Sequence, residues 1–247
     1  MTVLTSDADI RKIREAGKVV RDILAYAKEL VREGVSTAFL DSEIEKKIAE
    51  KSGEPAFKGY KGYPSAICAS VNSVVVHGIP SGKIVLREGD IVSIDVGIKK
   101  NGFYTDAAAT FAVGKVDRKT ARLMKITEKS LYEGIEEAVA GNRVGDISNA
   151  IQSIVEKNGY QEVRAFVGHG IGKELHEFPE VPNFGERGRG PRLKEGMILA
   201  IEPMVNTGTR EIKVLEDGWT AVTEDGKLSA HFEHTVIVGK EKAEILT

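Results

Sequence analysis

The sequence contains a single cysteine, Cys68, in 247 residues, so no disulfide can form within the chain. One thiol is typical of a reducing compartment, and the sequence predicts a soluble, cytoplasmic protein. No apolar run approaches the roughly 20 residues of a membrane span, and the first residues lack the basic and apolar segments of a secretory signal. A net charge of −2 argues against a membrane or specific DNA as a partner.

No segment rich in proline and serine divides the chain, and 41% hydrophobic with 29% charged residues is an ordinary globular composition. We therefore predict one catalytic domain over residues 1–247. An internal repeat predicts two pseudo-symmetric halves within it, about 1–115 and 116–247. Residues 86–95 read L-R-E-G-D-I-V-S-I-D and residues 193–202 read L-K-E-G-M-I-L-A-I-E, with five of ten positions identical. Each repeat ends in a carboxylate after an apolar strand, which requires a compensating cation or hydrogen-bond donors.

Hydrophobic spacing predicts the elements. A long amphipathic helix is expected over about 7–33, capped by Ser6 with Asp9 three positions on. Further helices should follow Thr37, Asp117 and Asp146. Strands are expected over 67–72, 74–77, 91–99, 104–113, 163–167, 198–205, 211–214, 219–222 and 231–238. This repeated order predicts an α+β fold with pseudo-twofold symmetry, its helices on one face of a sheet and a site on the other.

Asp95 and Asp106 lie on either side of a hairpin signal, Asn101-Gly102. That turn would pair Lys100 with Phe103 and place Gly97 opposite Asp106. Asp95 and Asp106 then become diagonal neighbours about 7 Å apart, close enough to share metal ions. Two bare carboxylates at that separation would drive one pKa up. An ordinary hairpin with two solvated acids is the alternative.

The second half adds Glu202, which ends the repeat, Glu233 in H-F-E-H-T, and His169 in G-H-G-I-G. With Asp95 and Asp106 these form a hard, oxygen-rich set without a thiolate, which favours Mn²⁺, Fe²⁺ or Co²⁺ and tolerates Zn²⁺. Four carboxylates exceed the charge of one divalent ion, so the sequence predicts two metal ions. Paired metals typically activate a bridging water and polarise a carbonyl or phosphoryl group.

Taken together, H-G-I-P at 77–80, Asp95 with Asp106, G-H-G-I-G at 168–172, His176, E-P-M at 202–204 and F-E-H-T at 232–235 resemble the type I methionine aminopeptidases in their short bacterial form. The resemblance runs from about residue 5 to the C-terminus. It implies the pita-bread fold, an antiparallel-rich curved sheet covered by helices on one face. It also implies removal of the initiator methionine from nascent proteins and peptides with a small second residue, by a hydroxide bound to two metals.

The resemblance also implies a role for each site residue. Asp95 would chelate one metal, His169 and Glu202 the other, and Asp106 and Glu233 would bridge both. Glu202 would accept a proton. His77 would contact the scissile amide nitrogen, and His176 would steady the carbonyl oxygen as it becomes an oxyanion.

The methionine pocket implied by the resemblance is lined by Phe57, Tyr60, Tyr63, Cys68, Leu175 and Trp219. Aromatic rings and a thiol give soft contacts for a thioether, although each of these residues could equally fill the core. Phe57 stands where some family members have cysteine, and Leu175 where some have an aromatic residue, so the pocket rim should differ. Asn72, Val74 and Ser229 match positions that hold a monovalent cation in some relatives.

Three alternatives stay open. An Xaa-Pro aminopeptidase or dipeptidase of the same fold would share the five ligands, although those relatives usually carry an additional amino-terminal domain that is not seen here. A non-catalytic scaffold or RNA-binding homologue should have lost ligands, and all five are present. Finally, a basic loop could contact ribosomal RNA or could simply be solvated; its residues are Arg187, Arg189, Arg192 and Lys194.

Overall fold

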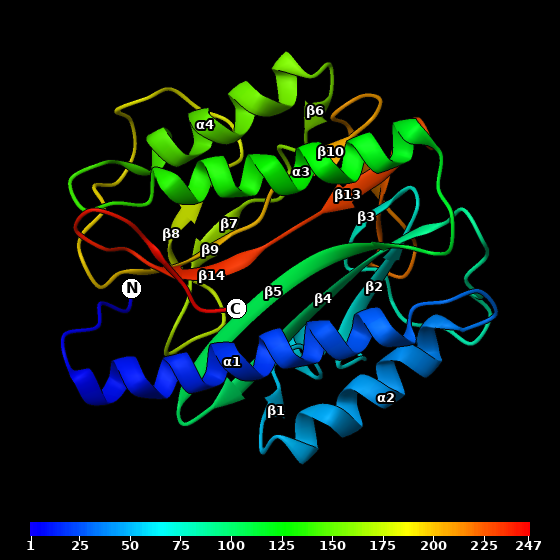
Figure 1. The fold of residues 1–247 in the computed structure, drawn as a ribbon, viewed down its shortest axis with the longest axis horizontal. Coiled ribbons are helices and arrows are strands. Elements are labelled where there is room, and N and C mark those ends of the chain that lie inside the picture. The colour runs from blue at the N-terminus through cyan, green and yellow to red at the C-terminus, as the bar shows by residue number, and fades with distance from the viewer.

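The helices form two packed pairs, one in each half of the chain, with the strands between them (Figure 1). The computed structural model describes residues 1–247. The first pair is α1 (Asp7–Leu30) and α2 (Thr37–Glu50), and the second is α3 (Arg118–Glu136) and α4 (Val144–Lys157). The predicted order of two helices followed by strands, repeated once, is therefore confirmed. No helix is long and apolar enough to cross a membrane.

Side-chain caps begin three of the helices. The hydroxyl oxygens of Ser6 and Ser36 accept the N–H groups of Asp9 and Phe39, and the Asp117 carboxylate accepts the N–H of Thr120. Asp9 does not complete a capping box with Ser6, because its carboxylate pairs with Lys12 instead. The prediction that Asp146 caps α4 is wrong as to position. Asp146 is the third residue of the helix, and its carboxylate accepts the N–H of Arg143, the true N-cap residue.

The strands form four antiparallel sheets. One contains β1 (Glu54–Pro55), β2 (Ile67–Val71), β4 (Ile91–Lys100) and β5 (Phe103–Ala112), and a second contains β6 (Gln161–Glu162), β10 (Met204–Asn206) and β13 (Ser229–His231). A third joins β3 (Val74–Val76), β11 (Ile212–Val214) and β12 (Ala221–Thr223). The last contains β7 (Gly168–Gly170), β8 (Glu177–Val181), β9 (Ile198–Ile201), β14 (His234–Ile237) and β15 (Glu244–Ile245).

Two predicted strands are each broken at an acidic residue. The expected strand over 198–205 divides into β9 and β10 at Glu202-Pro203, and the one over 231–238 divides into β13 and β14 at Phe232-Glu233. Pro203 has no N–H to donate to a ladder, which explains the first break. The strand expected over 163–167 is wrong, because only Gln161–Glu162 and Gly168–Gly170 pair with neighbours there. These breaks turn both glutamates out of the ladders.

The β4–β5 hairpin has the predicted register. Lys100 pairs with Phe103, and Gly97 pairs with Asp106. Asn101 and Gly102 both have positive φ, 54° and 79°, as the two-residue turn requires. Asp95 and Asp106 are therefore diagonal neighbours on one face of this hairpin.

The two copies of the internal repeat adopt matching conformations. Gly89 and Gly196 have φ of 93° and 81°, and a strand begins two residues after each, at Ile91 and Ile198. Leu86 and Leu193, which open the two repeats, are each 1% exposed. Asp95 and Glu202 consequently occupy equivalent places in the two halves.

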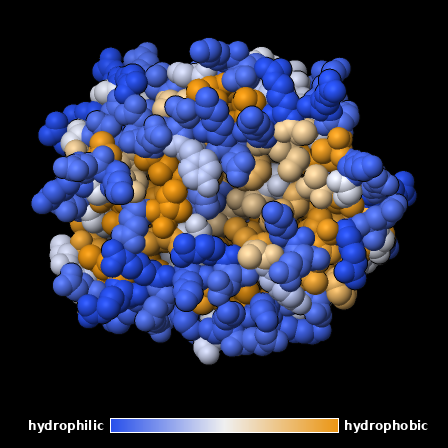
Figure 2. Space-filling view, in the orientation of Figure 1, coloured by the Kyte–Doolittle hydropathy of each residue, from blue (hydrophilic) through white to orange (hydrophobic).

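The hydrophobic core fixes which way the site residues face. Ile94, Val96 and Ile98 of β4 pack in one cluster with residues of α1 and α2. Since side chains alternate along a strand, Asp95 faces away from those helices. Leu199 and Ile201 of β9 pack in the same way in a cluster with α3 and α4. The prediction that helices cover one face and leave the other for a site is confirmed. Hydrophilic side chains dominate the outer surface of the helices (Figure 2).

Candidate metal centre

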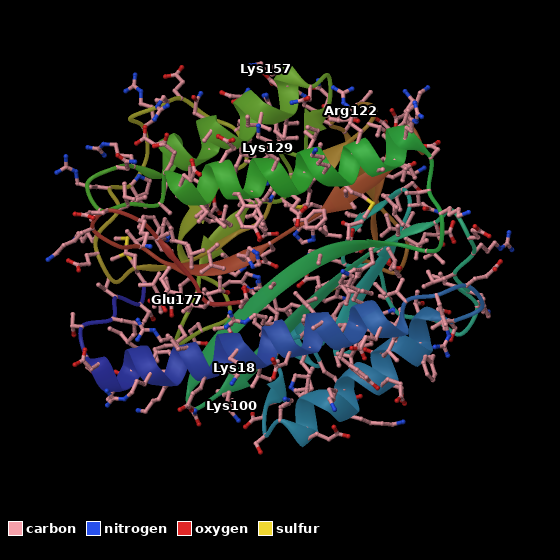
Figure 3. The ribbon with its side chains drawn as sticks, in the orientation of Figure 1. Lys18, Lys100, Arg122, Lys129, Lys157 and Glu177 are labelled. Carbon is pink, nitrogen blue, oxygen red and sulfur yellow. The ribbon has the colours of Figure 1, made fainter.

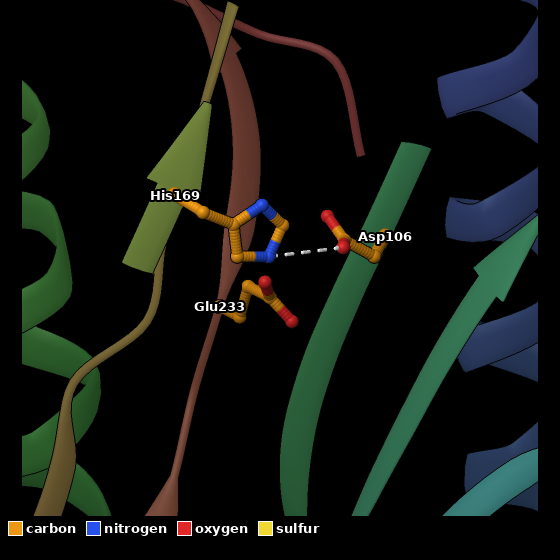
Figure 4. Close-up of side chains that lie close together, drawn as sticks. All are labelled: Asp106, His169 and Glu233. Carbon is orange, nitrogen blue, oxygen red and sulfur yellow. Dashed lines mark ion pairs between the residues drawn. The ribbon is translucent and has the colours of Figure 1, made fainter. Parts of the chain in front are cut away.

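Three buried side chains from three different strand regions converge on one point (Figure 4). Asp106, His169 and Glu233 each offer a ligand atom, and these atoms all lie within 4.8 Å of one another. The His169 Nε2 lies 3.6 Å from the Asp106 Oδ2. This spacing suits groups that converge on a cation between them.

Asp106 is held in place by Thr235 from the other half of the chain. The Thr235 hydroxyl donates to the backbone oxygen of Asp106 at 2.8 Å and lies 3.0 Å from its Oδ1, while the Asp106 N–H points back to the same hydroxyl at 3.1 Å. Asp106 is only 2% exposed. These contacts fix the carboxylate before any ligand arrives.

His169 presents its Nε2 to the carboxylates. Its Nδ1 lies 2.9 Å from the Gly170 oxygen, an acceptor, so Nδ1 carries the proton and the Nε2 lone pair is free. Nε2 lies 3.7 Å from the Glu202 Oε1. His169 pairs with Ala200 on β9, which places it on the same side as Glu202 two residues later. This is the tautomer that a metal ligand requires.

Glu233 and Asp95 complete the group. The Glu233 N–H donates to the Ala108 oxygen of β5 at 2.9 Å, which ties the β13–β14 break to the β4–β5 hairpin. Asp95 pairs with Cys68 on β2 and Ala108 on β5, and its Oδ1 is buried without any hydrogen-bond partner. Such an orphaned carboxylate oxygen points to a ligand that the protein itself does not supply.

The carboxylates have strongly perturbed acidities. Burial, and then the charges of their acidic neighbours, raise the pKa of Asp95 and Glu233 well above the usual range. Burial raises the pKa of Glu202 to about 8, against the opposing effect of His169. Burial also raises the pKa of Asp106. So many acids can ionise together only with a cation among them, and this hard oxygen and imidazole set fits divalent metal ions.

A single cavity of about 230 Å³ joins these five groups to the predicted pocket residues. Its lining contains every predicted catalytic, pocket and metal residue: Phe57, Tyr60, Tyr63, Cys68, His77, Asp95, Asp106, His169, Leu175, His176, Glu202, Trp219 and Glu233. The individual roles of these residues stay predictions.

The apolar end of the cavity is built from aromatic rings in edge-to-face contact. Tyr63 and Trp219 meet edge to face with centroids 5.1 Å apart. Phe57 fits because Gly97 has no side chain: a Cβ there would lie 2.5 Å from the Phe57 ring. Burial, then the charge of Asp95, raise the pKa of Cys68 well above its usual range, so this residue is a neutral thiol. Phe57 and Leu175 also belong to a core cluster, so they both line the pocket and pack the interior.

His77 and His176 line the same cavity as the five ligand-type side chains. His77 has φ of 58°, an unusual value for a residue with a side chain, and such strain is often found at functional sites. Burial, then the charge of His231, lower the pKa of His77 to about 4. Partial burial, then the charge of His169, lower the pKa of His176 to about 3, although part of this residue stays exposed. Both rings are therefore neutral at pH 7.

Three residues near the site escaped prediction. Lys61 lines the cavity beside Tyr60. Thr235 fixes Asp106, and the Nε2 of buried His231 lies 3.5 Å from the Glu202 Oε2 without a hydrogen bond. Thr235 and His231 are the two ends of the H-F-E-H-T segment, but no role was assigned to either, and their proximity to Glu233 was the available signal. Lys61 left no signal, because its position depends on an irregular turn with φ of 48°.

The chain is similar to known metallopeptidases in both sequence and fold. The model of metallopeptidase family M24 matches residues 11–240. The methionine aminopeptidase of Clostridium perfringens is 52% identical over 247 residues, which are all of this chain and 99% of that protein. The crystal structure of a methionine aminopeptidase from Thermotoga maritima has a TM-score of 0.98 at 44% identity and covers 100% and 99% of the two chains. The prolidase of Pyrococcus furiosus shares the fold, with a TM-score of 0.80 at 24% identity over 99% of this chain and 65% of that one.

Proposed function

The chain belongs to metallopeptidase family M24, and from this premise we infer that it is a pita-bread-fold aminopeptidase that removes the N-terminal methionine from peptides and proteins. The observation that carries this proposal is the shared cavity, in which five groups of metal-ligand type, three of them buried, lie beside an apolar pocket. An exopeptidase needs both, because it must bind one terminal side chain next to the hydrolytic centre.

We propose that two divalent ions would be held here by the side chains of Asp95, Asp106, His169, Glu202 and Glu233. Cobalt, manganese, iron and zinc all suit this ligand set. When bound, such ions supply an activated water and polarise the scissile carbonyl. Glu202, once a bound cation keeps its carboxylate ionised, would receive the proton of that water.

The two histidines would act on the substrate directly. His176 Nδ1 lies 2.8 Å from the Tyr60 hydroxyl. If that hydroxyl donates, the His176 proton is on Nε2, which can then donate to the developing oxyanion. His77, held on the Trp219 side of the cavity with ring centroids 6.2 Å apart, would contact the scissile amide nitrogen.

The apolar end would accept the methionine side chain. Tyr63, Cys68 and Trp219 provide the soft, polarisable contacts that suit an unbranched thioether. A crowded neighbouring position would restrict the second residue of the substrate to small side chains. Phe57 and Leu175 should shape the rim without removing activity.

We further propose that residues 1–247 act as one catalytic domain. Contacts between the halves support this, since Thr235 holds Asp106 and Glu233 bonds to Ala108. Neither half alone contains all five ligands.

A competing function is Xaa-Pro cleavage, since a prolidase shares the fold. The decisive test is cleavage of Met-Gly-Met-Met against Xaa-Pro peptides across a titration of Mn²⁺ or Co²⁺. We expect only the methionyl peptide to be cleaved, with activity that follows bound metal. Cleavage of the proline substrates alone would reject the proposal, and absence of turnover with tightly bound metal would favour a scaffold homologue.

A monovalent cation is proposed near Asn72, Val74 and Ser229. The Ser229 hydroxyl and the Asn206 Oδ1, which face each other across β10 and β13, are both buried without partners. Unpaired buried oxygens of this kind suit a hard monovalent ion. Potassium or sodium should therefore raise the melting temperature of the wild-type protein more than that of Ser229→Ala.

A transient ribosome contact is proposed for the basic loop of Arg187, Arg189, Arg192 and Lys194. Arg187 already pairs with Glu137 at 2.6 Å and Arg189 with Glu186 at 3.4 Å, which leaves Arg192 and Lys194 without carboxylate partners. Ribosome binding that survives neutralisation of all four residues would discard this contact. The single buried cysteine is consistent with the predicted cytoplasmic location.

A further inference from the structure

The turn that carries Leu175 and His176 into the cavity ends at a carboxylate that folds back beneath it. This turn, residues 172–177, is called the His176 turn below, and it joins β7 to β8. The Glu177 Oε1 accepts the backbone N–H groups of Lys173 at 2.8 Å and Glu174 at 3.1 Å. One oxygen thus holds two consecutive N–H groups near the start of the turn that presents His176.

A third donor reaches the same oxygen from a distant part of the chain. The Thr2 hydroxyl donates to the Glu177 Oε1 at 2.7 Å, and the Thr2 side chain packs where a Cβ on Gly172 would otherwise lie. Figure 3 labels Glu177, which lies near the N-terminal segment. The Glu177 side chain is only 6% exposed, and its Oε2 forms an ion pair with the amino terminus of Met1 at 3.0 Å. Hydrogen bonds to an ionised, buried acceptor are the strong kind.

Glu177 has been kept ionised in spite of its burial. Desolvation alone would raise its pKa, but the bonds from the Thr2 hydroxyl, from the amino terminus of Met1 and from the N–H groups of Glu174 and Lys173 outweigh that effect, and the pKa is lowered. Replacing the side chain with alanine would leave the Glu174 N–H without its acceptor and the Lys173 N–H with the Thr2 hydroxyl alone. An unsatisfied buried donor costs more than the bond itself contributes.

The rest of the His176 turn is anchored to the first half of the chain. The Gly172 oxygen accepts the N–H of Tyr104 at 2.8 Å, and the Lys173 ammonium lies 3.6 Å from the centroid of the Phe103 ring. His176 itself touches the Tyr60 hydroxyl. The turn therefore has fixed ends. The Glu177 carboxylate accepts both the Lys173 and the Glu174 N–H groups, while the Thr2 hydroxyl oxygen is a second acceptor for the Lys173 N–H at 3.2 Å.

We propose that Glu177 is a positioning residue for the aminopeptidase reaction: its carboxylate holds the His176 turn in the conformation that aims His176 at the scissile carbonyl and Leu175 at the methionine side chain. This inference depends on the proposed function. Glu177 touches neither substrate nor any proposed metal ligand. It acts through the two residues that precede it.

Three substitutions separate positioning from charge. Glu177→Gln keeps a side-chain oxygen at the same reach and can still accept the three bonds to Oε1, but it loses the ion pair with the Met1 amino terminus. Glu177→Asp keeps the charge but withdraws the oxygens by one methylene, and Glu177→Ala removes them. We expect kcat on Met-Gly-Met-Met to fall by about 10–100-fold in the Asp and Ala variants, with near wild-type kcat in the Gln variant. Metal affinity, measured by isothermal titration calorimetry, should stay within about twofold, because His169 and the carboxylates are anchored elsewhere.

A double-mutant cycle tests the route through His176. If Glu177 acts through His176, Glu177→Asp should cost little further kcat in a His176→Ala background. Equal loss in both backgrounds would overturn the inference, as would equal loss in the Asp and Gln variants or a parallel fall in metal affinity. If Glu177→Ala does not fold, the Asp and Gln variants still decide the outcome.

The same measurements distinguish the inference from the proposed function. Full activity of His176→Ala would refute the role of His176 and with it the proposal for Glu177. A large loss in His176→Ala with wild-type kinetics in Glu177→Asp and Glu177→Ala would refute only the positioning role.

Discussion

Asp106 is the residue at which the two halves of the molecule meet chemically. It belongs to β5, yet its carboxylate is held by Thr235 and faces His169, both from the second half. A buried carboxylate beside a threonine and a histidine costs free energy to ionise unless a cation completes the site. The effect of removing its charge should therefore be local to the metal centre and much larger there than on folding.

The first prediction concerns that charge. Asp106→Asn should lower divalent metal affinity and peptide turnover by about 100-fold or more, since even the outer partners of metal ligands contribute about 10–100-fold. Calorimetry and cleavage of Met-Gly-Met-Met measure the two effects. Asp146→Asn is the matched control, because that carboxylate is also buried but lies outside the site: it accepts the N–H groups of Arg143 and Gly188 and is 3.7 Å from the Arg187 Nε. Unaltered turnover in Asp106→Asn would refute the proposed metal site.

The second prediction concerns the support of Asp106. Thr235→Val keeps the shape of the side chain and removes the hydroxyl that donates to the Asp106 carboxylate. We expect metal affinity to fall by about 10–100-fold, whereas Thr235→Ser should retain it. Metal binding that is equally weak in both variants would mean that packing, rather than the hydrogen bond, orients Asp106.

For single residues, the sequence was sufficient where the residue type itself indicates the chemistry. Asp95 and Glu202 were found because an apolar repeat ends in an acid twice, and the structure places them equivalently. Thr235 and Lys61 were missed for different reasons. In the sequence Thr235 resembles any other strand residue. Its hydroxyl acquires a role only because β14 packs beside β5, where it bonds to Asp106. Lys61 reaches the cavity through a local turn geometry that no periodic pattern records.

At the scale of elements, the β4–β5 hairpin positions both aspartates, and its register depends on a two-residue turn. Gly102 has φ of 79° and open space around its α-carbon. An added methyl group therefore meets no neighbour, and only the backbone conformation resists it.

The third prediction concerns the free-energy cost of that backbone conformation. Gly102→Ala should lower the free energy of unfolding by about 1–2 kcal/mol, the cost of a left-handed conformation for a residue with a Cβ. Urea denaturation measures it. Gly82→Ala is the control, since Gly82 also has open space around its α-carbon but no positive φ. The free energy of unfolding of this variant should change by about 0.5 kcal/mol or less. Equal effects at the two positions would show that the turn does not constrain the hairpin.

The register of the β4–β5 hairpin could be predicted from the sequence, whereas the ends of several other strands could not. Asn101-Gly102 determines pairing through local backbone preference alone, so the sequence suffices. The continuous strands expected over 198–205 and 231–238 were wrong in one respect, because the chain leaves the ladder at Glu202 and Glu233. Both turn toward a site assembled from distant segments, and hydrophobic alternation carries no information about that assembly.

At the scale of the whole molecule, the acids that form the site work against folding until a cation arrives. The buried carboxylates keep their protons more readily in the folded state than in the unfolded chain, where Glu202 would have its ordinary pKa instead of about 8. A ligand that binds only the folded state adds stability in proportion to the logarithm of its concentration, about 2.7 kcal/mol at 100 times its Kd. Metal binding and folding should therefore be coupled through protons.

The fourth prediction follows from the sign of that coupling. Between about pH 7 and 8 the folded, metal-free protein still holds a proton on Glu202, whose pKa is raised to about 8, while the unfolded chain has lost it. Burial shifts the pKa of Asp95 and of Glu233 in the same direction. The unfolded state binds fewer protons, so stability falls as pH rises, by about 1.4 kcal/mol per pH unit for each group that stays protonated. The histidines with lowered pKa do not oppose this trend, because above pH 7 they are mostly neutral in both states.

Thermal or urea denaturation of chelator-treated protein from pH 7 to 8.5 measures this slope, and the same series with saturating Mn²⁺ provides the comparison. In the metal-free protein the melting temperature should fall steadily as pH rises. With metal the acids are ionised and neutralised by the cation, so the fall should disappear or reverse, and Asp106→Asn should lose most of the difference between the two series. A metal-free protein whose stability is flat or rising over this range would mean that its acids are already ionised, and that the cluster is compensated by groups of the chain itself rather than by bound ions.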